Sequence, residues 1–104
     1  MSTLSTEILE PIGMEVTIDD DTLSVELVDG RTISVPIAWF PRLAHALPEE
    51  RSNWRWIGKG RGIHWPDLDE DISVENLLEG KRSGESQVSF KMWLESRQRQ
   101  TPSD

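Results

Sequence analysis

An alternation of apolar and polar residues, beginning at Met14, constrains the fold of this chain more than any other feature. Apolar side chains occupy every second position in residues 14–18, 23–27 and 33–35. A period of two places successive side chains on opposite faces, so each run predicts a β-strand with one buried face. Asp29-Gly30 predicts a two-residue turn between the second and third strands, and Asp19-Asp20-Asp21 predicts the first turn. Together these patterns predict a three-stranded antiparallel meander.

After Pro36 the apolar spacing becomes helical. Pro41 fits the first turn of a helix, where a missing N–H costs nothing, and residues 48–51 predict a second short helical turn. We expect four apolar side chains of this region to lie over one face of the sheet: Trp39, Phe40, Leu43 and Leu47. Strand character returns in residues 53–57 and 62–65, which predict a second hairpin with Trp54 and Trp56 on one face.

The C-terminal third predicts an acidic loop and two helices. Pro66 ends the preceding strand, and residues 67–71 form the loop. Ser73 is a predicted N-cap for a helix over residues 74–78, with Gly80 as its stop. Residues 85–98 predict a final helix, which carries Phe90, Trp93 and Leu94.

These elements predict the α+β class: a small antiparallel sheet built from a three-strand meander and a second hairpin, packed by two or three short helices. The predicted single domain spans residues 13–95. A flexible N-terminal arm over residues 1–12 and a flexible C-terminal tail over residues 96–104 are expected to flank it.

Composition narrows the classes of function. The chain has 104 residues, no cysteine and a formal net charge of −8. It therefore has no disulfide, no thiolate zinc site and no cysteine nucleophile. Without a long apolar window or a signal-peptide pattern, we expect a cytoplasmic protein with no membrane partner. Its acidity argues against binding of nucleic acid by the chain alone, because phosphate contacts require clustered bases.

The aspartates at 67, 69 and 71 have the spacing that opens a calcium-binding loop. The rest of that pattern is missing, since Ile72 stands where the turn glycine belongs and Leu78 where the bidentate acid belongs. A solvated loop is the favoured interpretation, and a metal-binding module at Asp67, Asp69, Glu70 and Asp71 is an alternative.

The two histidines, His45 and His64, lack paired-ligand spacing, and no G-x-S-x-G elbow occurs. Both are interpreted as structural. The glycines at 58, 60 and 62 lead into no helix, so they predict a hairpin connection instead of a phosphate loop. The sequence therefore predicts no enzyme and no cofactor.

Five tryptophans in so short a chain are either core or interface anchors. Trp39 and Trp65 are predicted to be core. Trp54 and Trp56 alternate with Arg55 near Lys59 and Arg61, a mixture that is also typical of single-strand nucleic-acid platforms.

Three stretches resemble a bacterial family, the domain-of-unknown-function family 2442: residues 29–36, 39–43 and 62–75. The resemblance covers residues 13–94 and implies a small α+β protein for which no catalytic residues are defined. Members are often encoded beside another small family of unknown function, number 4160, and the pair has been proposed as a toxin and an antitoxin. Some longer relatives carry a helix-turn-helix domain, for which this chain has no remaining length.

We therefore predict a non-enzymatic interaction protein, an antitoxin-like partner of a small basic protein such as a family 4160 member. The predicted interface combines an aromatic strand with an acidic rim: Trp54, Trp56, Asp67, Asp69, Glu70 and Asp71. A DNA-associated regulatory module acting with a partner is the main alternative, and homo-oligomerisation is left open.

Overall fold

The computed structural model describes residues 10–100, with side chains as far as Arg97. Most of the predicted N-terminal arm (residues 1–9) and the last residues of the predicted tail (101–104) lie outside this description.

The predicted meander is confirmed as one antiparallel sheet, sheet A. It contains β1 (Gly13–Ile18), β2 (Thr22–Leu27) and β3 (Thr32–Pro36), in the order β1-β2-β3. Val25 lies opposite Val16 on one side and Ile33 on the other. The apolar alternation therefore lines up across three strands and forms one buried face.

Two details of this sheet differ from the prediction. Met14 is 54% exposed, because the β1–β2 register shifts between Gly13 and Glu15 and turns its side chain away from the core. The second turn has three residues instead of two: the Leu27 N–H donates to the Arg31 carbonyl at 2.8 Å, and Gly30 adopts a φ of 97°. This geometry is typical of three-residue hairpin loops, which place a left-handed residue last.

The second hairpin is also confirmed, but it belongs to a separate sheet with a third strand, sheet B. Its strands are β4 (Arg55–Ile57), β5 (Gly62–Trp65) and β6 (Glu70–Ser73), in the order β4-β5-β6. The prediction that residues 67–71 form one acidic loop was wrong, because Glu70 and Asp71 pair with Trp65 and His64. Pairing with β5 and burial of Ile72 override the low strand propensity of the acids.

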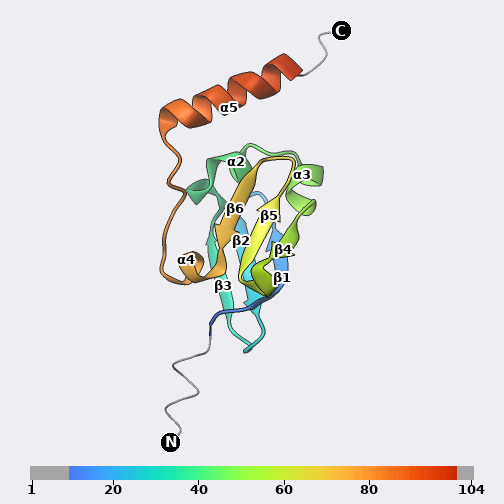
Figure 1. The fold of residues 1–104 in the computed structure, drawn as a ribbon, viewed down its shortest axis with the longest axis vertical. Helices are drawn as coiled ribbons and strands as arrows, with labels where there is room; N and C mark the ends of the chain where they lie inside the picture. The colour runs from blue at the N-terminus through green and yellow to red at the C-terminus, as the bar shows by residue number, and fades with distance from the viewer. Residues whose placement is uncertain (1–9, 101–104) are drawn as a thin grey trace, which may run out of the picture.

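Short helices join and cover the sheets (Figure 1). After β3 come a 3-10 turn, η1 (Ile37–Trp39), and two helices, α2 (Pro41–Ala44) and α3 (Pro48–Ser52). A second 3-10 turn, η2 (Gly58–Gly60), connects β4 to β5. Leu47 lies between α2 and α3 and is 52% exposed, so its predicted packing on the sheet was wrong.

The last two helices start at serine caps. Ser73 caps α4 (Val74–Leu78) by accepting the Asn76 N–H at 3.2 Å, as predicted. Gly80 follows α4 with a φ of 78°. The final helix, α5 (Gln87–Gln100), begins two residues later than predicted and continues beyond residue 95. Its N-terminus is capped by Ser86, whose hydroxyl accepts the Ser89 N–H at 3.0 Å.

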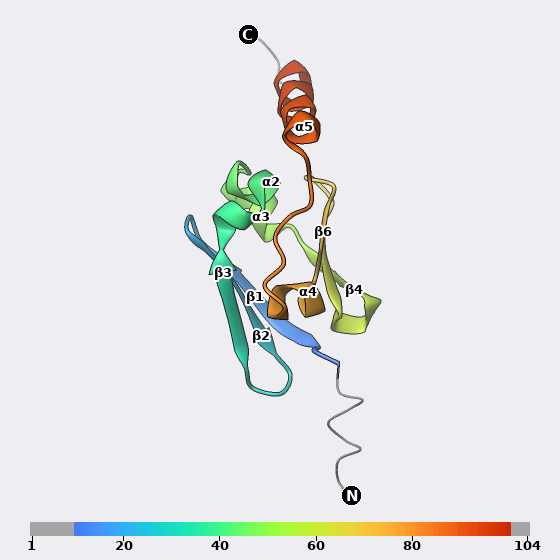
Figure 2. The ribbon, with the colours of Figure 1, turned by 90° about the vertical axis from the view of Figure 1, so that its left-hand side faces the viewer.

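Sheets A and B form two layers with one core between them (Figure 2). Sheet A contributes residues such as Leu23 and Val25, and sheet B contributes Ile63, Trp65 and Ile72. Trp65 is fully buried, as predicted, whereas Trp39 is only partly buried against the core. The α+β class is therefore confirmed. Among the described residues, no helix is long and apolar enough to cross a membrane.

Candidate functional site

The two tryptophans predicted to anchor an interface lie between the sheets. Trp54 and Trp56 are partly buried against the core, and their rings meet edge to face with centroids 5.1 Å apart. The Trp56 ring lies directly over Gly13 of β1, where an added Cβ would be 2.2 Å from its nearest atom. Trp56 thus joins β4 to β1, and Trp54 packs on it at the margin of the core.

Arg55 lies on the opposite face of β4 from Trp56. Trp56 pairs with the buried Ile63, whereas the exposed Arg55 pairs with His64. Strand alternation therefore separates the aromatic rings from the adjacent base.

The four predicted acidic rim residues do not form one surface. Asp71 lies on the outer face of sheet B and contacts His64, with Oδ1 2.5 Å from Nδ1. Glu70 lies two residues before Ile72 on β6, so its side chain is on the same inward face, and it is partly buried. Asp67 and Asp69 are exposed on the β5–β6 loop, where Asp67 accepts a hydrogen bond from Asn53 at 2.9 Å. That bond brings Asp67, alone of the four, beside the residue that precedes Trp54.

Exposed acids, two of these four among them, gather at one end of the sandwich, which we call the acidic end. The β1–β2 turn reaches α3 there, because Arg51 Nη1 and Asp20 Oδ1 are 2.9 Å apart. The β5–β6 loop reaches the end of α3 through Asn53. The exposed acids of the acidic end are Asp19, Asp20, Asp21, Glu49, Asp67 and Asp69.

Backbone hydrogen bonds keep the first of these acids ionised. The Asp19 carboxylate accepts the N–H groups of Asp21 and Thr22 at 2.8 and 2.7 Å. These bonds lower the pKa of Asp19 below its usual value because they favour the charged form. The turn predicted as a solvated hairpin tip therefore presents a fixed negative charge.

A groove of about 290 Å³ opens between this turn and α3, and we call it the Trp54 groove. Arg51 and Ser52 of α3 also line it, but Arg51 is occupied: it donates to the Leu43 and Ala44 carbonyls, both at 3.0 Å, besides pairing with Asp20. The remaining lining combines apolar side chains with two carboxylates: Val16, Ile18, Pro48, Trp54, Asp19 and Asp20.

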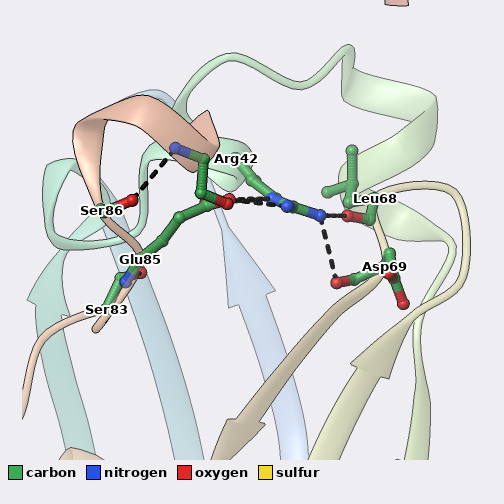
Figure 3. Close-up of polar contacts among 7 residues, drawn as sticks. Arg42, Leu68, Asp69, Ser83, Glu85 and Ser86 are labelled. Carbon is green, nitrogen blue, oxygen red and sulfur yellow. Dashed lines mark hydrogen bonds and ion pairs between the residues drawn. The ribbon is translucent and has the colours of Figure 1, made fainter. Parts of the chain in front are cut away.

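Arg42 connects three segments of the chain (Figure 3). Its Nε and Nη2 donate to the Glu85 carboxylate, with a shortest distance of 2.6 Å, and Nη1 donates to the Leu68 carbonyl at 2.8 Å. The Trp93 ring of α5 lies 5.1 Å from the guanidinium. The Arg42 hydrogen bonds lower the pKa of Glu85. Arg42 therefore ties α2 and the β5–β6 loop to the start of α5.

A second arginine attaches the C-terminal part of α5. Arg97 donates to both carboxylate oxygens of Glu50, at 3.0 and 2.9 Å, and lies 4.6 Å from the Trp93 ring. Its hydrogen bonds lower the pKa of Glu50. Phe90 stacks on Trp93 and contacts the ring of His45, with centroids 5.1 Å apart in the latter pair. Sequence reasoning missed the contacts of α5 with His45 and Glu50, because partners more than forty residues apart leave no local pattern.

Glu70 gives the stability of the protein a specific dependence on pH. The pKa of Glu70 is raised to about 7, mainly by burial; Arg42 opposes the rise, and Glu85, Asp71 and Asp69 contribute to it. The folded state thus holds a proton that the unfolded chain releases near pH 4.5, so the stability that Glu70 costs grows between about pH 4.5 and 7 and is then constant.

Glu70→Gln is therefore expected to stabilise the protein by about 1–2 kcal/mol at about pH 8 and hardly at all at about pH 5, after discounting for partial exposure. Urea unfolding across this range measures the effect. Glu95→Gln, at an exposed position of α5, is the control and should show no such trend. Equal stabilisation by Glu70→Gln at both pH values would contradict the assignment.

Two further features that the sequence singled out are the aspartates of residues 67–71 and the glycines of the second hairpin. Asp67, Asp69 and Asp71 do not converge, and no group of three or more His, Asp or Glu side chains in the described part of the chain could hold a metal ion. Gly60 lies against Ile12, where an added Cβ would be 2.8 Å from Cγ2, so the glycine loop is packed against the residues before β1.

Comparisons with known proteins identify the sandwich but name no activity. Two solved structures have a similar fold. A protein of unknown function from Rhodospirillum rubrum has a TM-score of 0.64 and 25% identity, over 79% of this chain and 99% of that one. An uncharacterised protein from Chromobacterium violaceum has a TM-score of 0.61 and 21% identity, over 95% of this chain and 85% of that one. No curated protein matches. The family model described as "Protein of unknown function (DUF2442)" matches residues 14–83.

Proposed function

This chain belongs to the DUF2442 family of proteins of unknown function, and we propose that it is a non-enzymatic interaction protein whose acidic end binds a small basic protein. The pairing would be that of an antitoxin-like protein with its cognate partner. The observation that carries the proposal is the Trp54 groove, in which two carboxylates face apolar and aromatic walls.

The charge of the acidic end defines the partner. Three arginines lie at this end, and each is already paired: Arg42 with Glu85, Arg51 with Asp20, and Arg97 with Glu50. These pairs leave the exposed acids Asp19, Asp21 and Asp69 to set the sign of the surface. A basic partner complements such a surface and is steered towards it, which raises its association rate.

The groove itself suits one long cationic side chain of that partner. A lysine or arginine buries its aliphatic stem against apolar surface while its charge stays near water and counter-charges. Val16, Ile18 and Pro48 offer that surface, and the Trp54 ring adds a face that attracts cations. Because the rings of Trp54 and Trp56 pack edge to face, we assign Trp54 to contact the partner and Trp56 to hold Trp54 in position.

The proposal predicts that Asp19→Asn combined with Asp21→Asn, which leaves the pair between Arg51 and Asp20 intact, weakens binding of the partner about tenfold or more, which corresponds to about 1.4 kcal/mol. Asparagine retains an oxygen for the turn, so the fold should persist. The measurement is calorimetric titration with the basic product of the adjacent gene, co-purified with the tagged chain.

Glu15→Gln combined with Glu26→Gln is the matched control, because it removes the same charge from the outer face of sheet A. This pair should leave the affinity within about twofold. Equal weakening by both pairs would show an effect of net charge alone. Failure of any basic neighbour to co-purify would overturn the proposal.

A further inference from the structure

The outward row of α5 is apolar although it faces solvent. Val88 and Met92 stand one helical turn apart and are 69% and 62% exposed. The inward row carries Phe90 and Trp93, which pack on each other and reach His45 and Arg42. The contacts that fix α5 on the sandwich therefore do not require the outward pair.

Val88 and Met92 form one wall of a groove of about 490 Å³ between α5 and the β5–β6 loop. Trp93 continues the apolar wall, and Asp69 faces it from the loop. Ser89 and Ser96 also line the groove, and their short side chains leave room for another backbone to approach α5 closely. We call this space the α5 groove.

The charge that the α5 groove offers a partner is negative. Arg42, which also lines the groove, is satisfied by Glu85 and by the Leu68 carbonyl. Asp69 has an exposed side chain on the same rim. The complement of this lining is an apolar surface with a positive charge at its margin.

We propose that the α5 groove docks an amphipathic helix of a basic protein, with apolar residues on Val88, Met92 and Trp93 and a lysine or arginine beside Asp69. Helices commonly bind in this mode, with anchors spaced three or four residues apart. The α5 groove shares no lining residue with the Trp54 groove, so the inference is independent of the function proposed above. The wall of this groove that α5 contributes lies C-terminal to Ser83, where the family match ends.

The test is an NMR titration of the full, ¹⁵N-labelled chain with a synthetic helical peptide, two repeats of Leu-Lys-Lys-Leu-Leu-Lys-Leu. Shifts are expected to cluster on α5 and the β5–β6 loop. Val88→Gln combined with Met92→Gln should weaken the peptide about tenfold or more. Both substitutions suit an exposed helix position, so the fold is expected to remain intact.

Leu47→Gln combined with Leu78→Gln is the matched control, because it removes two other exposed apolar side chains. The control should leave the affinity within about twofold. A peptide of equal charge in which serine replaces leucine should bind at least about tenfold more weakly. Equal binding of the two peptides, shifts centred on Trp54, or no effect of the Val88 and Met92 substitutions would overturn the inference.

Discussion

Trp65→Ala is expected to lower the free energy of unfolding by about 3–5 kcal/mol, a large share of the stability of a small domain. Trp65 is fully buried between the sheets, and its indole N–H donates to the Arg51 carbonyl at 3.0 Å. Truncation therefore leaves a cavity and removes the partner of a part-buried carbonyl in α3. Urea unfolding followed by circular dichroism measures the change.

Trp39→Ala is the comparison for that measurement. Trp39 is only partly buried, with the Arg82 guanidinium 4.8 Å from its ring. Its truncation should cost clearly less than that of Trp65, because less area is withdrawn from water. Equal losses at the two positions would contradict the placement of Trp65 at the centre of the core.

Gly13→Ala is expected to destabilise the protein by about 1–3 kcal/mol, although alanine is a minimal change. The new Cβ would stand 2.2 and 2.4 Å from two atoms of the Trp56 ring, so the ring or strand β1 must move. The cost is steric, because Gly13 is not among the glycines with positive φ. Thermal and urea unfolding measure the effect.

A double-mutant cycle tests the cause. With Trp56→Leu as background, the cost of Gly13→Ala should fall well below its value in the wild type, because the clashing ring is gone. Gly84→Ala has no atom within 4 Å of the added Cβ and should change stability by less than about 0.5 kcal/mol. An unchanged cost in the Trp56→Leu background would assign the effect to the backbone.

The strands of sheet A could be predicted because their signal is local. Val16, Val25 and Val35 alternate with polar residues, and the sequence marks the two turns that join the three strands. The exposure of Met14 could not be predicted, because it depends on a register shift between two strands. The strand β6 was missed for a related reason: Glu70 and Asp71 are poor strand formers, and only pairing with β5 places them in a sheet.

The candidate site was predictable only in part. The sequence singled out Trp54 and an acidic loop, but strand parity sends Glu70 inward and Asp71 outward. Asp67 reaches Asn53, but the acids that line a groove with Trp54 are Asp19 and Asp20, more than thirty residues earlier in the chain. Their approach depends on the pair between Arg51 and Asp20, which is visible only once β1 and α3 are placed together.

The geometry of Arg42 has an evolutionary consequence. All three guanidinium nitrogens donate, two of them to Glu85 and one to the Leu68 carbonyl. Lysine has a single nitrogen and could not span these acceptors. Glu85 lies just beyond the segment that the family shares. Among relatives, we therefore expect an acid at position 85 to be accompanied by arginine, and not lysine, at position 42.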